Sequence, residues 1–307
     1  MNLLLALLLP ILLITLWLYT AHLTRTSFPV LRNKRICLLI AHPDDEAMFF
    51  SPTLLALTVP SLGNHIKILC LSTGDNDGLG AVRQQELVKS AELLGLRAPK
   101  EDVFVLDSPK FPDSMTATWL AEDVAEVLRS AFLPAQATGK RPGGKSNGSV
   151  EGPPEATIDV LLTFDRGGVS GHVNHVSLYH GVRNWLESLM KGREGWRCPV
   201  EMYTLTSTNI LRKYISILDA PISMLWGVTR DAFKSEKGVG QRSSKGREGA
   251  IQSPPDKMLF VSDMAQYRTA QTAMTHGHKS QMRWFRWGWI GVGRYIVVND
   301  LKREVIP

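Results

Sequence analysis

The sequence predicts an α/β protein with a Rossmann-like, doubly wound and mainly parallel sheet, preceded by an N-terminal transmembrane helix. Three observations lead to this fold class. The chain opens with one long apolar run, strand and helix patterns then alternate, and the candidate strands are apolar throughout. Strand–helix alternation with continuously apolar strands is typical of parallel sheets that are covered by helices on both faces.

The apolar run occupies the first twenty-odd residues. Leu3–Tyr19 holds no charged residue and would span about 25 Å as a helix, and extension to Leu23 would cover a bilayer core. Membrane helices tolerate a proline such as Pro10, and Trp17 and Tyr19 suit the aromatic belt at a membrane surface. A cleaved signal peptide is the alternative, but no basic residue precedes the run, which is also long for that role. We therefore expect residues 1–24 to be a retained anchor.

Charge and cysteine content indicate where the rest of the chain, residues 25–307, lies. Four basic residues follow the apolar run, and the positive-inside rule puts them in the cytosol: Arg25, Arg32, Lys34 and Arg35. The three cysteines form no evident disulfide framework, which fits a reducing compartment. The net charge of +6 permits an anionic partner, but no recognition motif accompanies it, so we expect no nucleic acid to bind.

Strand and helix patterns alternate after the anchor. The candidate strands are short and rich in Val, Ile and Leu, at residues 36–40, 66–71, 103–106, 158–164 and 201–206. The helical patterns between them cover residues 46–57, 80–96, 116–132 and 175–189. Gly95 is expected to stop the second helix, and Ser114 to begin the cap of the third. In such a sheet, ligands bind at the carboxyl ends of the strands.

Two segments interrupt this alternation. Residues near 134–157 are rich in Pro, Gly, Lys and Ser, and residues near 234–255 combine Gly and Ser with an excess of basic residues. Segments of this composition bury too little apolar surface to become ordered. We therefore expect two disordered insertions within one domain. The first contains the only N-glycosylation sequon of the chain, at Asn147, which a cytosolic location would leave unmodified.

The first candidate strand runs directly into AHPDDE, residues 41–46. Crowded carboxylates raise one another's pKa and repel, so they persist where a positive charge lies among them. His42 and Asp45 are three residues apart on a tight loop that Pro43 stiffens, so both can point at one cation. A neighbouring carboxylate could then stay free as a base. A catalytic zinc site uses three protein ligands and a water, so a third ligand is expected from elsewhere.

The second motif, GGVSGHVNH, follows the strand at residues 158–164. His172 and His175 lie three residues apart where this loop meets a helix. Either histidine alone would more often be structural than functional. Because the loops after two parallel strands meet at one edge of the sheet, the pairing of both motifs favours a functional site.

Together these motifs resemble the PIG-L/LmbE-like family of metal-dependent de-N-acetylases. AHPDDE matches the first family signature and GHVNH matches the second. The resemblance covers residues 35 to about 212, with a further match at HKSQMRWFR near the C-terminus. It implies Zn²⁺ or another divalent metal as the cofactor, with three ligands: His42, Asp45 and His175.

The same resemblance implies the roles of four more residues. Asp44 would be the general base, and His172 would stabilise the oxyanion or donate a proton. Arg83, in an R-x-x-E that follows a glycine loop, would bind an anionic part of the substrate, although a surface ion pair with Glu86 is the plainer interpretation. His278, in HKSQMRWFR, is interpreted either as lining the site or as structural.

Two other segments have alternative interpretations. Asp107 and Asp113 could contact sugar hydroxyls or remain solvated loop carboxylates. The tryptophan-rich segment RWFRWGWIGVG fits a core helix, and a helix at a bilayer surface is the alternative. The absence of a G-x-G-x-x-G after the first strand excludes dinucleotide binding of the usual kind.

An anchor joined to this domain resembles the family members that act on GlcNAc-phosphatidylinositol. The resemblance implies hydrolysis of its N-acetyl group to GlcN-phosphatidylinositol and acetate, the second step of GPI-anchor biosynthesis. It also implies a single-pass protein of the endoplasmic reticulum membrane whose catalytic domain faces the cytosol, with protein partners unidentified. Deacetylation of another GlcNAc conjugate and a non-catalytic membrane scaffold are the alternatives. The anchor disfavours soluble substrates, and the intact polar residues disfavour a scaffold.

Overall fold

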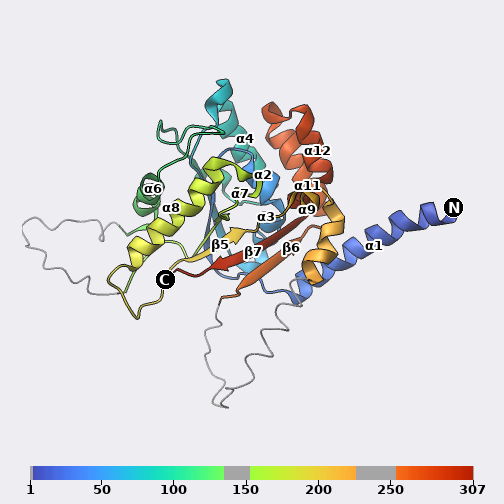
Figure 1. Cartoon of the computed structure of the whole chain (residues 1–307), viewed down its shortest axis with the longest axis horizontal. Helices are drawn as coiled ribbons and strands as arrows, with labels where there is room; N and C mark the ends of the chain where they lie inside the picture. Colours follow the sequence, from blue (N-terminus) through green and yellow to red (C-terminus); the bar gives the residue numbers. More distant parts are fainter. Residues whose placement is uncertain (1–2, 135–152, 226–253, 307) are drawn as a thin grey trace, which may run out of the picture.

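The computed structural model describes residues 3–134, 153–225 and 254–306. Its centre is a seven-stranded sheet with the order β3-β2-β1-β4-β5-β7-β6 (Figure 1). The first five strands in that order are parallel, and β7 and β6 extend the sheet in antiparallel fashion. The predicted α/β, mainly parallel, doubly wound fold is confirmed.

The bounds of the elements are as follows. The strands are β1 (Arg35–Ile40), β2 (His65–Cys70), β3 (Val103–Val105), β4 (Val160–Phe164), β5 (Glu201–Leu205), β6 (Lys257–Val261) and β7 (Val298–Glu304). The helices used below are α1 (Leu3–Ser27), α2 (Asp45–Phe49), α3 (Ser51–Leu57), α4 (Gly80–Leu93), α5 (Pro99–Asp102), α6 (Ala121–Phe132), α7 (Gly168–Gly171), α8 (Val173–Met190), α9 (Ile210–Lys213), α11 (Met264–Thr272) and α12 (Trp284–Val292), with a short turn, η4, at Ser216–Leu218.

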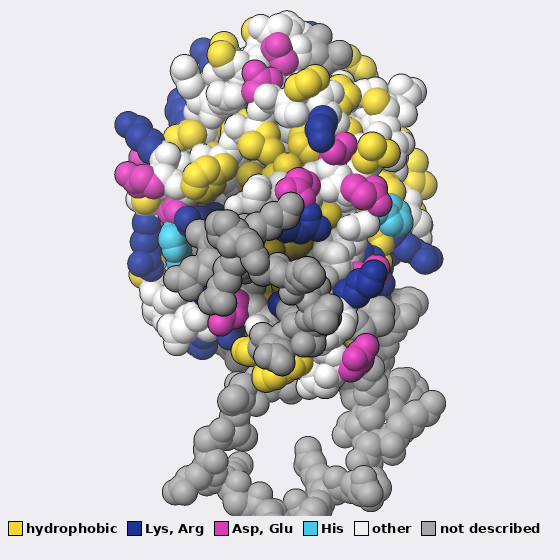
Figure 2. Space-filling view, turned by 90° about the vertical axis from the view of Figure 1, so that its left-hand side faces the viewer, with side chains coloured by type: hydrophobic (Ala, Val, Ile, Leu, Met, Phe, Trp, Pro, Cys, Tyr) yellow, Lys and Arg dark blue, Asp and Glu magenta, His cyan; other side chains and the backbone are white. Residues whose placement is uncertain are grey.

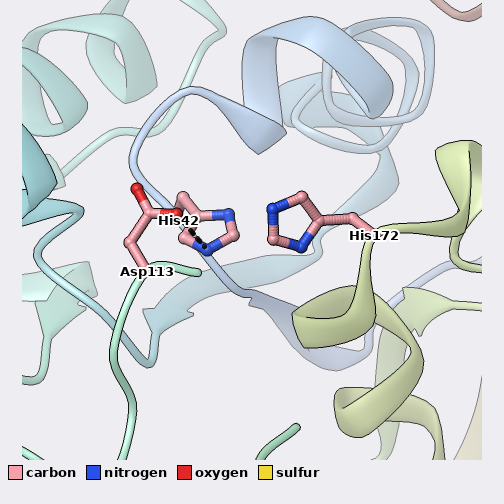
Figure 3. Close-up of side chains that lie close together, drawn as sticks. All are labelled: His42, Asp113 and His172. Atoms are coloured by element: carbon pink, nitrogen blue, oxygen red, sulfur yellow. Dashed lines mark ion pairs between the residues drawn. The ribbon is translucent and has the colours of Figure 1, made fainter. Parts of the chain in front are cut away.

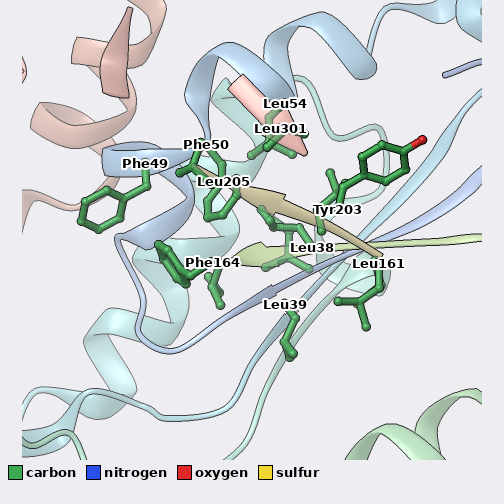
Figure 4. Packing of buried hydrophobic residues seen from close by; sticks show 14 of the residues in the cluster. Leu38, Leu39, Phe49, Phe50, Leu54, Leu161, Phe164, Tyr203, Leu205 and Leu301 are labelled. Atoms are coloured by element: carbon green, nitrogen blue, oxygen red, sulfur yellow. The ribbon is translucent and has the colours of Figure 1, made fainter. Parts of the chain in front are cut away.

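The core lies on both faces of the central strands. Every residue of β4 is buried, and so is every residue of β1 after Arg35. Apolar side chains from β1, β4, β5 and β7 meet those of α2 and α3 (Figure 4). Helices α6 and α8 cross closely where Gly181 faces Val124, and a β-carbon at Gly181 would overlap that valine. This packing fixes the strand ends that carry both motifs.

Several predicted boundaries differ from the structure. The helix predicted at residues 46–57 is divided into α2 and α3 at Phe50. The cap predicted at Ser114 is wrong: its hydroxyl accepts the N–H groups of Thr116 and Ala117 in a local turn, and α6 begins only at Ala121. Such local side-chain bonds compete with helix formation. Gly95 does follow the end of α4, with φ of 96°.

Strands β6 and β7 were not predicted. The sequence of β7, VNDLKRE, holds four charged residues, so it lacks the apolar character of the parallel strands. The β6 strand begins directly after the segment expected to be an insertion. Most of both expected insertions, including Asn147, lies outside the described residues.

The predicted apolar helix is present as α1, and it is the one helix among the described residues long and apolar enough to cross a membrane. Its C-terminal part packs on the domain. The Trp17 indole donates to the carbonyl of Ser262 at 2.8 Å, and Arg25 pairs with Asp263 at 2.6 Å. The expected domain boundary at residue 24 therefore falls inside a helix that already contacts the domain from Trp17 onward.

Candidate active site

Both sequence motifs lie where the winding of the sheet reverses. The chain passes from β1 to β2 and β3 on one side, and then crosses to β4 and β5 on the other. Strands β1 and β4 are therefore neighbours whose following loops diverge, and this is where open α/β sheets bind ligands. AHPDDE leaves the carboxyl end of β1, and the GHVNH loop follows β4. The topology thus brings together two motifs that are about 130 residues apart.

The structure groups His42, Asp45 and His175, with one potential ligand atom of each within 4.8 Å of the others. All three side chains are buried. His175 Nδ1 lies 3.1 Å from the carbonyl of Gly168, which leaves Nε2 directed inward. Nε2 makes no hydrogen bond, although Asp45 Oδ1 is 3.1 Å away. A lone pair facing a carboxylate oxygen at this distance requires a proton or a metal cation between the two atoms.

Asp45 is held so that only one of its oxygens faces His175. The other, Oδ2, accepts the N–H groups of Ala41 at 3.0 Å and His42 at 2.9 Å. Two ligands on a tetrahedral zinc with bonds of about 2.0–2.1 Å lie roughly 3.3 Å apart, close to the separation observed here. Metal-bound histidines also commonly donate their second ring nitrogen to a carbonyl, as Nδ1 of His175 does. The residues present therefore fit a zinc-type cation.

His42 is oriented by a residue that the sequence did not single out. Its Nε2 lies 3.1 Å from Asn174 Oδ1 and 3.3 Å from Asp113 Oδ1, while Nδ1 lies 3.8 Å from Asp45 Oδ2. Asn174 is fully buried and donates its amide to the carbonyl of Ala117 at 2.8 Å. An Nε2–H that points to Asn174 leaves Nδ1 available on the Asp45 side. The clue to Asn174 was its place inside GHVNH.

A second group shares His42. One atom each of His42, Asp113 and His172 also lies within 4.8 Å of the others, and Figure 3 shows His42 between the two partners. Asp113 and His172 are only half-buried, and no described backbone N–H group holds the Asp113 carboxylate. Asp45 and His175 are buried and fixed by backbone groups, so the first group is the better cation site.

Asp44 is buried in a strained backbone conformation, with φ of 131°. Its N–H donates to Glu46 Oε2 at 3.2 Å, and its carboxylate pairs with Arg286. Burial raises the pKa of Asp44, although the Arg286 guanidinium opposes that rise. Burial likewise disfavours ionised Asp45, but the adjacent His175 and His42 hold the pKa of Asp45 below its usual range. The pKa of Asp44 is therefore raised, whereas the pKa of the neighbouring Asp45 is lowered.

His172 caps the N-terminus of α8. Its Nδ1 accepts the N–H of Asn174 at 3.2 Å, so the neutral ring carries its proton on Nε2. Burial, together with the neighbouring His175 and His42, lowers the pKa of His172 to about 4. The ring is therefore a neutral hydrogen-bond donor near pH 7. Its centroid lies 4.8 Å from that of His42.

The C-terminal segment HKSQMRWFR packs against the AHPDDE loop. His278 is fully buried, with Nε2 2.6 Å from Glu46 Oε1 and Nδ1 3.0 Å from the amide of Gln281. Gln281 also donates to the carbonyl of Pro43 at 2.8 Å. His278 therefore lies behind the loop with both ring nitrogens in contact with other side chains, as the structural interpretation of this residue expects.

Arg83 lies at the rim of the site. Its Nη1 lies 2.5 Å from the carbonyl of Gly74 and 3.4 Å from Asp113 Oδ2. The expected surface ion pair between Arg83 and Glu86 is not the contact that Glu86 makes. Its carboxylate instead accepts the N–H and the hydroxyl of Ser280. Arg83, Arg283 and Arg286 line a cavity of about 370 Å³ together with the aromatic rings of α12. Among the described residues, Asp107 makes no side-chain hydrogen bond or ion pair with this group.

The chain is similar to known proteins over most of its length. The profile of the family PIG-L: GlcNAc-PI de-N-acetylase matches residues 37–186. The N-acetylglucosaminyl-phosphatidylinositol de-N-acetylase of Arthroderma benhamiae is 53% identical, over 91% of this chain and 90% of its own. The protein of that name from Bos taurus is 35% identical, over 88% and 83%. Among solved structures, N,N'-diacetylchitobiose deacetylase from Pyrococcus horikoshii is 13% identical with a TM-score of 0.46, over 95% of this chain and 90% of its own.

Proposed function

Because this chain belongs to the PIG-L family of GlcNAc-PI de-N-acetylases, we propose that it hydrolyses the N-acetyl group of GlcNAc-phosphatidylinositol. The products are GlcN-phosphatidylinositol and acetate, and the reaction is the second step of GPI-anchor biosynthesis. One observation carries the proposal. The buried Nε2 of His175 makes no hydrogen bond and lies 3.1 Å from Asp45 Oδ1, and a second buried carboxylate, Asp44, is the next residue along the chain.

Zn²⁺ is the proposed cofactor, held by His42, Asp45 and His175. Two imidazole nitrogens and one carboxylate oxygen would hold it, which is the number of protein ligands typical of catalytic zinc sites. When bound, such a cation would polarise a carbonyl and lower the pKa of a coordinated water to about 7. Asn174 and the carbonyl of Gly168 each hold one nitrogen of an imidazole ring, which leaves the other nitrogen of each ring available as a ligand.

The proton transfers fall to Asp44 and His172. Asp44 is buried, has a raised pKa and is not one of the three ligands, so it can accept the proton of the attacking water. Neutral His172 presents Nε2–H to the oxygen of the cleaved acetyl group as it becomes negative. The departing glucosamine nitrogen must gain a proton, which Asp44 can supply after it has taken one from the attacking water.

The arginine-lined cavity suits the phosphoinositol part of the substrate. Arginine binds phosphate with two parallel hydrogen bonds, and Arg83 has a buried Nε without a partner among the described residues. Arg286 reaches the same cavity and also pairs with Asp44, which connects the cavity to the reacting centre. Arg83 is thus the proposed substrate-binding residue.

The proposed location is the endoplasmic reticulum membrane, with one span and the catalytic domain in the cytosol. Helix α1 supports the single span. The cytosolic side is supported by Arg25 in the last turn of this helix and by Arg32, Lys34 and Arg35 after it.

The test uses the purified full-length chain in detergent or lipid. The protein is stripped with a chelator, reloaded with single metals and assayed for acetate release from GlcNAc-phosphatidylinositol. We expect activity to disappear on chelation and to return with Zn²⁺ or another divalent metal. Release of acetate only from a different GlcNAc conjugate would favour the alternative substrate. A stripped protein that keeps full activity would contradict metal dependence.

A further inference from the structure

Helix α1 packs on the domain along one face of its C-terminal part. Trp17, Thr20, Ala21 and Thr24 lie on that face and are buried against the domain. The candidate membrane span, Leu8–Ser27, contains all four of these residues. The surface of the domain around Trp17 therefore lies beside the proposed span, and a bilayer that holds α1 lies close to that surface.

A chain of contacts leads from Trp17 to helix α12. The Trp17 ring packs edge-on against Tyr267 of α11, with centroids 5.9 Å apart. The Tyr267 hydroxyl donates to the carbonyls of Ile290 and Gly291, at the C-terminal end of α12. Helix α1 also contacts η4, and η4 contacts α12. The elements α9, α11 and α12 lie on the side of the domain from which α1 projects (Figure 1).

The same elements expose large apolar side chains. Trp284 of α12 is 86% exposed and Trp287 is 58% exposed, while Ile210 and Leu211 of α9 are 77% and 72% exposed. Outside α1, sixteen large apolar side chains of the described residues are exposed, and half belong to α9, η4, α12 or the turn between α9 and η4. The opposite side of the domain mixes apolar side chains with charges of both signs (Figure 2). Concentration of apolar surface marks an interaction site.

We propose that α9, η4 and α12 form a membrane-docking face whose exposed apolar side chains insert into the lipid interface beside the span. Its occupant is the bilayer that holds α1, because the face continues the surface at which α1 leaves the domain. Tryptophan, tyrosine and arginine are the residues that favour this depth, and α12 carries two exposed tryptophans with Arg283 at its N-cap. The face adjoins the arginine-lined cavity, so a lipid-linked substrate enters the site without leaving the membrane.

The first test measures depth and is independent of activity. Full-length protein with Cys198→Ser is reconstituted in phosphatidylcholine vesicles, with one cysteine introduced as Leu211→Cys or Trp287→Cys and labelled with an environment-sensitive dye. Trp196→Cys is the matched control, because Trp196 is also exposed but lies after α8. We expect blue-shifted emission and quenching by spin-labelled lipid at positions 211 and 287 only. The proposal is overturned if the labels at positions 211 and 287 keep the emission of a dye in water. It is also overturned if their emission shifts only when a second protein is added.

The second test uses the substrate and rests on the proposed function. Leu211→Glu and Trp287→Glu lie outside the arginine-lined cavity. Because interfacial binding scales with buried apolar area, we expect these variants to lose about tenfold in turnover of vesicle-embedded substrate. Hydrolysis of a short-chain, water-soluble GlcNAc-phosphatidylinositol should be unchanged, and Trp196→Glu should affect neither. Equal loss on both substrates overturns the docking role. Wild-type protein that cleaves neither substrate refutes the proposed function, while the depth measurement still decides the docking face.

Discussion

Asp44 is held in place by contacts from both ends of the chain. Its backbone is strained, its N–H is bound to Glu46 and its carboxylate pairs with Arg286 from α12. Strain of this kind persists where the surroundings determine the conformation, and it concentrates at functional sites. The position of Asp44 therefore depends on a network of side chains.

Asp44→Asn should keep the metal and lose most of the turnover. The amide cannot accept a proton from water, and a positioned general base contributes about 10²–10⁴-fold in rate. The measurement is kcat with metal content determined in parallel by elemental analysis. Near-normal turnover in a metal-replete protein would remove Asp44 from the role of base.

The variants His175→Ala and His172→Ala should separate metal binding from catalysis. The first removes a proposed ligand, so we expect the purified protein to lose metal. The second leaves the three ligands intact, so the metal should stay while the rate falls about a hundredfold or more. Metal analysis and single-turnover assays on the same preparations distinguish the two. A full complement of metal in His175→Ala would move the ligand assignment to another residue.

Asn174→Ala should weaken the metal site without removing a ligand. Asn174 holds His42 through Nε2, and outer residues of this kind change metal affinity or activity by about 10–100-fold. Competition with a chelating dye gives the affinity directly. Asn184→Ala is the control, because Asn184 lies on the same helix and makes only a long surface contact with Glu122. Equal affinities in the two variants would contradict the orienting role.

At the scale of elements, α6 and α8 can approach only because residue 181 is glycine. A β-carbon there would overlap Val124, so Gly181→Ala should lower the free energy of unfolding by about 1–3 kcal/mol. Gly288→Ala in α12 is the control, since its β-carbon would meet nothing within 4 Å. Thermal unfolding of both variants checks the prediction. Gly181→Ala with unchanged stability would show that the helices move apart freely.

The elements also show what the sequence could predict. The five parallel strands were predicted because buried strands are apolar along their whole length. Strand β7 was missed because it contains four charged residues and therefore lacks the apolar pattern of the parallel strands, although it pairs with β5 and β6. At the site, the place of both motifs after parallel strands predicted that they meet, whereas the choice of His42, Asp45 and His175 as ligands came from the family resemblance. Arg286 was not linked to Asp44, because nothing local joins residues 242 positions apart.

At the scale of the whole molecule, the proposed topology can be tested with intact microsomes. Protease added from outside should digest the catalytic domain, because basic residues in the last turn of α1 and after it favour the cytosolic side for the domain. Asn147 should remain unmodified for the same reason. A glycosidase-sensitive mobility shift that disappears in Asn147→Gln would reverse the orientation. A domain that resists protease in intact microsomes and is digested only after detergent is added would also reverse the orientation.

The attachment of HKSQMRWFR to the AHPDDE loop has a consequence for protein synthesis. Residues 42–46 emerge from the ribosome early, but Glu46 and Asp44 acquire His278 and Arg286 only when the last tenth of the chain has been translated. A messenger RNA with a stop codon after codon 270 would still encode both family signatures. Its product would lack β7 and every contact from α12. We therefore expect an inactive, truncated protein that still carries the membrane helix. Premature stop codons near the end of the gene should therefore be as damaging as those at its beginning.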